Sequence, residues 1–254
     1  MSENIGAQLE RMPWQAQVLR LTAFPIPSPT TRQAGWWEEI VGQTPAAITS
    51  RPKQGSYHEE GPFSNGRLIC EIASARIDWL FIPGDLEAED DGLATIGAFS
   101  DTLKTFRQLA DQWFGLETCP SAQRLAFGVV LLQSVESKQT GYRQLSMYLP
   151  RIELDPENSS DFMYQINRPR ESRSGIPNFK INRLMKWSVA TLKRFPIQSL
   201  RGVGLGRTSF ACRLELDVNT AQEFEGQIPR EQMSTVFQEL TDLAWEIAER
   251  GDIP

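Results

Sequence analysis

The only histidine of this chain, in the segment Tyr57-His58-Glu59-Glu60-Gly61, is the first candidate for acid–base or metal chemistry. A histidine beside a carboxylate can transfer protons, and both residue types bind zinc. A zinc site needs further ligands, however, and adjacent residues on a strand point to opposite faces. The segment therefore predicts a solvated loop without a metal. Acid–base catalysis by His58, Glu59 or Glu60 is the less favoured alternative, and we expect a protein that is not an enzyme.

A phosphate-binding loop is suggested by the glycine-rich segment 202–207, which has the sequence Gly-Val-Gly-Leu-Gly-Arg. A P-loop ends in lysine followed by serine or threonine, and it leads into a helix whose N-terminus binds the anion. Neither signal is present here, because the residues that follow alternate as a strand does. We therefore predict a hairpin connection and no bound cofactor.

Two short basic segments could bind an anion, since the pattern Arg-Pro-basic occurs at residues 51–53 and again at 168–170. The second segment begins a stretch, residues 168–207, that is markedly basic in a chain of net charge −6. Clustered Arg and Lys side chains bind a nucleic-acid backbone or the acidic tail of a protein. The alternative is that these side chains are solvated, or paired with the acidic residues 85–91. The candidate binding residues are Arg51, Lys53, Arg168, Arg170, Arg173 and Arg183.

Trp245 is a further candidate binding residue because it lies on the polar face of the last predicted helix. On a helical wheel its neighbours include Glu239, Asp242, Glu246 and Glu249. A large aromatic side chain on such a face is either covered by another part of the chain or anchors a partner. The sequence leaves both alternatives open.

The elements that must position these residues are predicted by the hydrophobic periodicity. Asn65-Gly66 between apolar flanks predicts a hairpin, and the apolar positions of 99–113 and 233–247 recur as on amphipathic helices. Alternation over 210–218 predicts a strand with one buried face. Residues 125–132 are apolar on both faces, which predicts a strand covered on both sides. Further strands are expected at 15–24, 68–73, 76–82, 162–167 and 179–189, short helices near Trp36 and at 140–149, and a polar loop through 51–53.

The two halves of the chain resemble each other. The motif glutamine, any residue, glycine, aromatic begins at Gln33 and again at Gln139, and each half has the order strand, helix, two or three strands, long helix. We predict an α+β fold of duplicated β-α-β-β-(β)-α half-domains, with residues 1–118 as the first pseudo-repeat and 119–254 as the second. One curved antiparallel sheet with both long helices packed on one face would cover the exposed apolar face of each half. This order is similar to that of the TATA-binding-protein fold, which implies a saddle-like architecture and no function.

Composition argues against several classes of protein. The chain has 254 residues, of which 40% are hydrophobic and 23% charged, as in packed soluble domains. Its start lacks a secretory pattern, and no apolar stretch is long enough to span a membrane. The three cysteines, Cys70, Cys119 and Cys212, are far apart, which favours a reducing cytoplasm over a disulfide framework. The net charge of −6 argues against nucleic-acid binding by the whole surface.

We therefore expect a non-catalytic cytoplasmic binding or adaptor protein, such as a regulatory, immunity or antitoxin-like subunit of a larger complex. Its partner would be another protein, bound on the sheet or along the final helix, and no membrane contact is expected. The alternative is a nucleic-acid-binding protein that uses segment 168–207 and the loop with Arg51 and Lys53. The sequence makes no prediction of the oligomeric state.

Overall fold

The computed structural model describes residues 11–26, 35–84, 93–194 and 207–252, which form one open antiparallel sheet of eleven strands and four α-helices. The first half of the chain contributes β1 (Gln15–Pro25), α1 (Trp36–Val41), β2 (Ala47–Arg51), β3 (Ser56–Phe63), β4 (Gly66–Ala73), β5 (Arg76–Pro83), β6 (Gly97–Ala98) and α2 (Phe99–Gly115). The second half contributes β7 (Ala122–Val135), α3 (Lys138–Ser146), β8 (Met163–Asn167), β9 (Arg170–Glu171), β10 (Lys180–Arg194), β11 (Arg207–Thr220) and α4 (Met233–Arg250). The predicted α+β class is confirmed.

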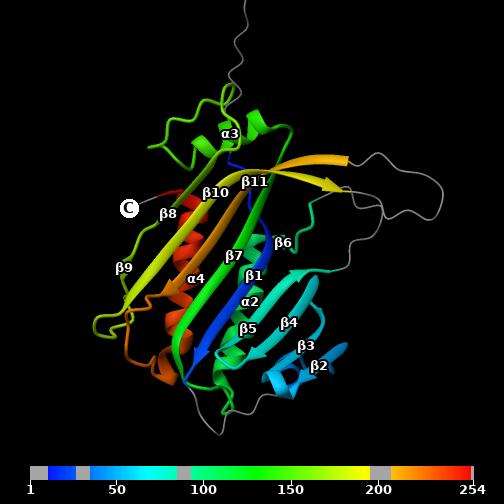
Figure 1. The fold of residues 1–254 in the computed structure, drawn as a ribbon, viewed down its shortest axis with the longest axis vertical. Coiled ribbons are helices and arrows are strands. Elements are labelled where there is room, and N and C mark those ends of the chain that lie inside the picture. The colour runs from blue at the N-terminus through cyan, green and yellow to red at the C-terminus, as the bar shows by residue number, and fades with distance from the viewer. Residues whose placement is uncertain (1–10, 27–34, 85–92, 195–206, 253–254) are drawn as a thin grey trace, which may run out of the picture.

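The sheet is continuous because β1 and β7 pair at its centre (Figure 1). The strand order is β2-β3-β4-β5-β1-β7-β11-β10-β8, with β6 beside β1 and β9 beside β10. The ladder between β1 and β7 runs from Gln15 opposite Leu132 to Pro25 opposite Ala122. Strands of the first half therefore lie on one side of this pair, and strands of the second half lie on the other.

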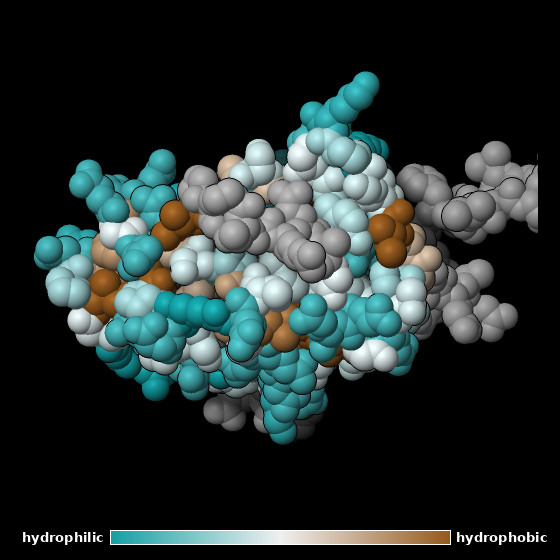
Figure 2. Space-filling view, turned by 90° about the horizontal axis from the view of Figure 1, so that it is seen from below, coloured by the Kyte–Doolittle hydropathy of each residue, from teal (hydrophilic) through white to brown (hydrophobic). Residues whose placement is uncertain are grey.

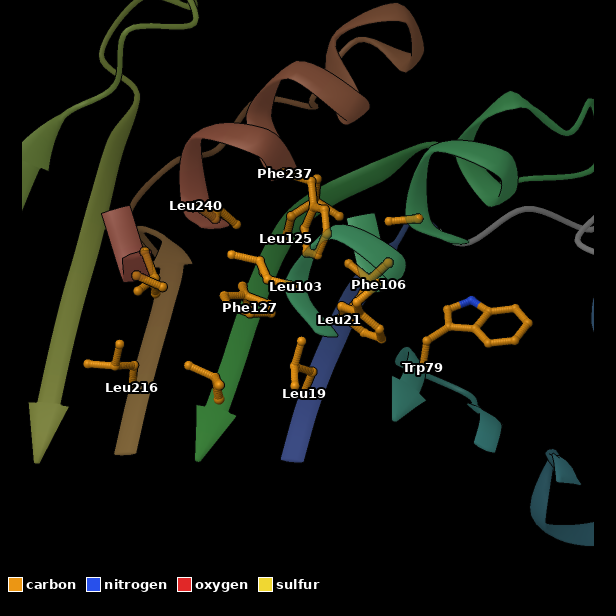
Figure 3. Close-up of a cluster of buried hydrophobic side chains, with 14 of the residues drawn as sticks. Leu19, Leu21, Trp79, Leu103, Phe106, Leu125, Phe127, Leu216, Phe237 and Leu240 are labelled. Atoms are coloured by element: carbon orange, nitrogen blue, oxygen red, sulfur yellow. The ribbon is translucent and has the colours of Figure 1, made fainter. Parts of the chain in front are cut away.

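The hydrophobic core lies between one face of this sheet and the two long helices (Figure 3). Leu19 and Leu21 of β1 and Phe127 of β7 are fully buried on this face, where they meet Phe106 of α2 and Phe237 of α4. Burial of each such side chain contributes about 1.5–3 kcal/mol. Alternation along the strands thus directs every second side chain toward the helices, as predicted for residues 210–218.

The two long helices, α2 and α4, pack against each other in antiparallel directions. The ring centroids of Phe106 and Phe237 are 6.3 Å apart, and Arg107 Nε donates a hydrogen bond to Thr241 Oγ1 at 2.7 Å. The start of α2 at Phe99 lies against Trp245 near the end of α4. Both helices were expected from their apolar stripes, and both are confirmed.

The strand expected at 125–132 is longer than predicted, and its second face is covered only in part, because Ala126 and Leu132 are buried there while the residues between them are not. Its odd-numbered side chains, such as Phe127, are buried beneath the helices, whereas Gly128 and Val130 are half-buried on the opposite face of the sheet. No helix packs on that face among the described residues (Figure 1). The prediction of a strand covered on both sides therefore holds at its ends and is wrong around Gly128 and Val130.

The polar loop expected through residues 51–53 is confirmed for Pro52 and Lys53 but not for Arg51, which ends a short strand, β2, that the sequence did not predict. β2 pairs with β3 from Ala47 opposite Glu60 to Arg51 opposite Ser56. All five residues of β2 are exposed, so no alternation of polar and apolar side chains marks it in the sequence. Backbone pairing to β3 holds this edge strand in place, and only the three residues Pro52–Gln54 after it form a helical turn.

The hairpin predicted at Asn65-Gly66 is present, but its turn lies one residue earlier than the motif indicates. Ser64 has a φ of 50°, and Gly66 is already the first residue of β4, opposite Pro83 of β5. A Cβ on Gly66 would lie 2.4 Å from the carbonyl oxygen of Ile82. Glycine is needed here for close packing of two strands rather than for a positive φ.

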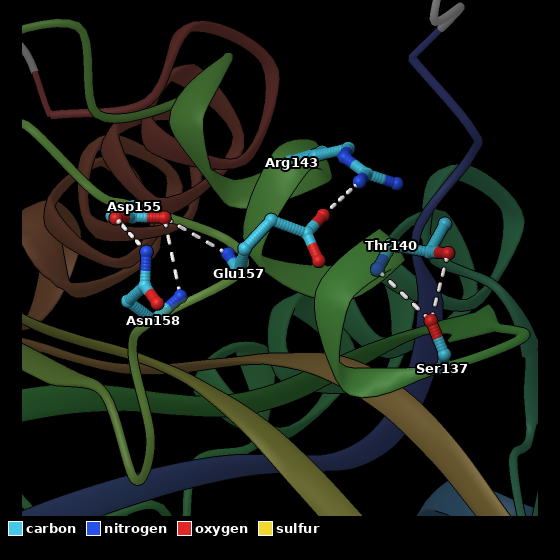
Figure 4. A network of polar contacts seen from close by, with 6 residues as sticks. All are labelled: Ser137, Thr140, Arg143, Asp155, Glu157 and Asn158. Atoms are coloured by element: carbon cyan, nitrogen blue, oxygen red, sulfur yellow. Dashed lines mark hydrogen bonds and ion pairs between the residues drawn. The ribbon is translucent and has the colours of Figure 1, made fainter.

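Polar contacts order the region of α3 and the loop that follows it (Figure 4). The Ser137 side chain accepts a hydrogen bond from the backbone N–H of Thr140 at 3.1 Å and caps the helix. Arg143 forms an ion pair with Glu157. Asp155 accepts hydrogen bonds from the backbone N–H groups of Glu157 and Asn158, and these bonds, with one from the Asn158 side chain as the largest cause, lower the pKa of Asp155.

Some sequence features lie outside the described residues. They are Gln33 of the repeated motif, the acidic segment 85–91 and the glycine-rich segment, of which only Arg207 belongs to a described strand.

Gly66→Ala is expected to destabilise the fold by about 1–3 kcal/mol, as at other overpacked sites, because the new methyl group would collide with the backbone of Ile82. Gly115→Ala at the end of α2 is the matched control, since nothing lies within 4 Å of a Cβ there and a helix favours alanine. Urea unfolding followed by tryptophan fluorescence measures both variants. An unchanged midpoint for Gly66→Ala would contradict this packing of β4 on β5.

Candidate functional site

A groove with a volume of about 640 Å³ runs along the outer face of α4. It is bounded by Trp245 and, from the loop after β9, by Arg173 and Ser174. Four carboxylates of α4 line it: Glu239, Asp242, Glu246 and Glu249. Two of the residues predicted to bind a partner, Arg173 and Trp245, are therefore brought to one site, which we call the α4 groove.

Trp245 is partly covered by its own chain and partly exposed. Its ring stacks on Phe99 of α2, with centroids 5.4 Å apart and planes at 30°. The side chain is nevertheless 36% exposed, and it lines the α4 groove. Coverage by another part of the chain, the first alternative left by the sequence, thus holds in part, because α2 supports one side of the ring and leaves the rest accessible. The second alternative, an anchor for a partner, stays a prediction.

The loop that bounds the groove is fixed by a carboxylate of α4. Glu239 accepts a hydrogen bond from Ser172 Oγ at 2.6 Å and another from the backbone N–H of Arg173 at 2.8 Å. These bonds use both oxygens of the carboxylate. The side chain of Arg173 is exposed at the groove.

The other carboxylates of the groove have basic neighbours. Asp242 pairs with Arg107 of α2, and Glu246 lies 3.7 Å from Arg170 and 3.3 Å from Arg250. Glu249 is exposed, and its carboxylate has no ion pair among the described residues. The groove therefore has an acidic rim in which Glu249 is the charge most accessible to a partner.

The second basic segment, residues 168–170, is paired with carboxylates at the end of α4. Arg168 Nε and Nη2 donate to the two oxygens of Asp252 at 2.5 and 2.7 Å, and Tyr164 donates its hydroxyl to the same carboxylate at 2.7 Å. Asp252 is 6% exposed. The sequence offered the acidic residues 85–91 as a pairing alternative, whereas Arg168 and Arg170 pair with Asp252 and Glu246.

The ion pair with Arg168 lowers the pKa of Asp252, with the hydrogen bonds from the guanidinium as the largest cause. Asp252 also donates its backbone N–H to the carbonyl of Tyr148 at 2.9 Å. Gly251 has a φ of 84°, and a Cβ there would lie 2.0 Å from the same carbonyl oxygen. The end of α4 is thereby locked to the α3 region.

Arg183 is buried, with an exposed fraction of 3%, and its guanidinium is structural. Its Nε donates to the backbone carbonyl of Arg168 at 2.8 Å, and burial lowers the pKa of this guanidinium. A buried side chain of this kind holds the loop after β8 in place. Arg183 therefore supports the backbone of the second basic segment from within the protein.

The first basic segment lies far from the second, at the opposite edge of the sheet. Arg51 ends β2, and Lys53 belongs to the turn that follows, whereas Arg168 follows β8 at the other edge. Both Arg51 and Lys53 are exposed. A single anion that contacts both segments would have to cross the whole width of the sheet.

The histidine segment is a strand, and the prediction of a solvated loop is wrong. On β3 its side chains alternate, so Glu59 is 3% exposed on the helix side, while His58 and Glu60 lie half-buried on the other face. Glu59 accepts hydrogen bonds from Tyr57 Oη at 3.1 Å and from the backbone N–H of Trp37 at 3.4 Å. Burial, followed by Glu59, raises the pKa of Tyr57 to about 12. Glu59 therefore ties α1 to β3, which only the three-dimensional contacts reveal.

His58 lies on the same face of β3 as Glu60 and on the opposite face from Glu59. Its Nε2 lies 3.5 Å from Glu60, which also pairs with Arg67 at 2.8 Å. A hollow of about 280 Å³ beside it is lined by Arg51 and Glu71 among others. This open site joins the histidine with one predicted binding residue, Arg51.

The cysteines are buried thiols without a disulfide. Burial raises the pKa of Cys119 and of Cys212 to about 12, and it also raises the pKa of Cys70 well above its ordinary value. Thiols in this state are weak nucleophiles. Within the described ranges, no three His, Cys, Asp or Glu side chains are grouped so that they could hold a metal ion.

Exposed apolar side chains are scattered rather than gathered in one patch. Figure 2 shows them on one end of the molecule in small groups among hydrophilic residues. Among the described residues the large exposed ones are Met12 before β1, Ile48 on β2, Met163 on β8 and Trp245 on α4. Among the described helices, none has the length and apolar character needed to cross a bilayer.

A second hollow, of about 380 Å³, lies on the sheet face opposite the long helices, and sequence reasoning missed it. Gly128 of β7 lies at its centre, flanked by Arg20 of β1 and Asp217 of β11. A glycine inside a strand is an available signal for such a site, because it marks a close approach to the backbone.

Comparison with known proteins adds no assignment: no family model matches the chain, and no curated protein or solved structure matches it either.

Asp252→Asn is expected to lower the free energy of unfolding at neutral pH and to have little effect in strong acid. Because the pKa of Asp252 is lowered in the folded state, its stabilisation is fully present above the ordinary value of 3.8 and is lost as pH falls through the folded value. Denaturant unfolding across this pH range measures the difference from the unmodified chain, with the exposed Glu223→Gln as control. A pH-independent difference would contradict a stabilising ion pair with Arg168.

Proposed function

We propose that this chain is a non-catalytic adaptor or regulatory subunit, of the immunity or antitoxin kind, that binds a partner protein in the α4 groove. The observation that carries the proposal is Trp245, a ring held in place by Phe99 yet 36% exposed beside four carboxylates. Aromatic anchors of this type supply much of the free energy of protein–protein binding.

The partner is a protein that presents arginine or lysine next to an apolar side chain. Glu249 and the rest of the acidic rim favour positive charge, and the net charge of −6 would speed the encounter with a basic surface. An arginine over Trp245 would add a cation–π contact. Because Trp245 is stacked in advance on Phe99, little side-chain entropy is lost on binding.

The absence of an assembled catalytic set among the described residues supports binding rather than catalysis. The thiols are buried and protonated, and the histidine pairs with a carboxylate that Arg67 already neutralises. Reduced, buried cysteines also suit the cytoplasm that we propose as the location.

Nucleic-acid binding by segment 168–207 is the alternative with less support. Arg168 and Arg170 are paired with Asp252 and Glu246, so phosphates would have to compete with carboxylates of the same chain. Arg51 and Lys53 lie at the far edge of the sheet and cannot add to the same local patch.

The order of the elements supports our proposal that the fold arose by duplication, with repeats at 1–118 and 119–254. In each half the first strand, β1 or β7, lies at the centre, a short helix follows, and the last long strand, β5 or β11, pairs beside the first. An experimental structure tests this idea by superposition of the two halves. Failure of β1, β4, β5 and α2 to superpose on β7, β10, β11 and α4 would rule it out.

Trp245→Ala is expected to weaken partner binding by about 2 kcal/mol or more, which is about 30-fold, because the anchor is lost. Affinity purification with quantitative mass spectrometry identifies proteins that the unmodified chain retains, and titration with the purified partner gives the dissociation constants. Ile48→Ala, which truncates an exposed apolar side chain on β2, is the matched control.

Two outcomes separate this proposal from a purely structural role of Trp245. Trp245→Phe keeps an aromatic ring on Phe99 and should retain most of the stability while it loses part of the affinity. Equal partner retention by the unmodified chain and by Trp245→Ala, or an equal loss with Ile48→Ala, would contradict an anchor in the α4 groove.

A further inference from the structure

The second hollow, on the sheet face away from α2 and α4, has the features of a small-molecule site. Its volume is about 380 Å³, within the usual range for pockets that hold compact ligands. It lies over β1, β7, β11 and β10, the four central strands that Figure 1 shows in front of the long helices. It is separate from the α4 groove, which belongs to the outer side of the helix layer.

Gly128 forms the floor of this hollow. In register across the sheet, one row of residues on this face runs Leu80, Arg20, Gly128, Asp217 and Leu184. Gly128 does not have the positive φ that would require glycine, so the backbone conformation suits any residue. What the glycine provides is space between two charged side chains, where an alanine or valine would fill the floor.

Arg20 supplies the charge of the site. Its Nε lies 3.4 Å, and its Nη2 3.6 Å, from the point that a Cβ on Gly128 would occupy, so the guanidinium extends over the floor. Arg20 has neither an ion pair nor a hydrogen bond from its guanidinium to any described residue. A half-buried guanidinium with free donors is a strong binder of a carboxylate.

Of the two carboxylates in the hollow, Glu215 is paired with basic side chains, whereas Asp217 keeps its negative charge. Glu215 accepts ion pairs from Lys186 at 3.1 Å and from Arg213 at 3.2 Å, and Asp217 accepts a hydrogen bond from the side chain of Asn219 at 3.0 Å. These carboxylates would repel a dianion such as a phosphate monoester. The hollow therefore suits a ligand with a single negative charge placed at Arg20.

The walls are mostly apolar. Val18, Leu80, Val130 and Leu184 are half-buried and surround the floor without a covering element among the described residues. Contact with an apolar ligand would remove this surface from water, at about 25 cal/mol for each Å². Together the floor, the guanidinium and the walls match a molecule with a carboxylate at one end and an apolar body.

The geometry points to a binding site for a small aromatic or medium-chain monocarboxylic acid, with the carboxylate on Arg20 and the apolar body over Gly128. This site goes beyond the proposed protein partner and does not depend on it. A ligand bound here would contact only the sheet face and would leave the α4 groove free.

Isothermal titration calorimetry with 4-phenylbutyrate and with octanoate tests the site on the full chain. We expect saturable one-to-one binding of the acids and at least tenfold weaker binding of 4-phenylbutanol, which has the same apolar body without the charge. Arg20→Gln is expected to weaken acid binding at least tenfold, and Gly128→Val to abolish it. Lys193→Gln removes an exposed positive charge elsewhere on β10 and should bind as the unmodified chain does.

Several results would overturn the assignment. They are no saturable binding of either acid to the unmodified chain, equal affinity for acid and alcohol, or equal affinity for Arg20→Gln and the unmodified chain. Binding of an apolar peptide through its C-terminal carboxylate, without binding of the free acids, would also overturn it. Circular dichroism of each variant checks the fold, and the comparison of acid with alcohol needs no variant. Trp245→Ala should leave acid binding unchanged. A failure of this proposal can therefore be distinguished from a failure of the proposal for the α4 groove.

Discussion

The pairing of β1 with β7 is the constraint on which the rest of this structure depends. It joins the strands of both halves into one sheet, and it brings Phe127 of β7 within ring contact of both long helices, at 6.2 Å from Phe106 and 5.7 Å from Phe237. The core is therefore one cluster that contains residues from both sides of this seam. Neither half could bury its apolar face as completely without the other.

Two surfaces remain available because the helices cover one side of the sheet only. The outer side of α4 presents Trp245 and an acidic rim, and the loop after β9 is fixed there by Glu239. The opposite side of the sheet presents Arg20 above a glycine floor. We propose opposite partners for the two surfaces, a basic protein for the α4 groove and a small anion for the sheet face. This separation would let one chain bind both at once.

The sequence predicted those parts of the fold that have a strong local period. The stripe of α4 and the alternation of β11 decide which side chains face the core, so their elements and burial were correctly predicted. β2 was missed because its pairing uses the backbone alone. At the candidate sites, residue types were found but partners were not: Arg168 and Asp252 are 84 positions apart, and the packing of Trp245 on Phe99 joins two helices. Such contacts depend on the whole fold.

Native-state hydrogen exchange tests most directly whether the seam between β1 and β7 makes the chain one cooperative unit. The account predicts that amides of β1 and β7 exchange only by global unfolding, with equal free energies that match that of the single denaturant transition. Exchange of β1 with β3, β4 and β5 at a distinctly lower free energy than β7, β10 and β11 would contradict it, because the two halves would then unfold separately.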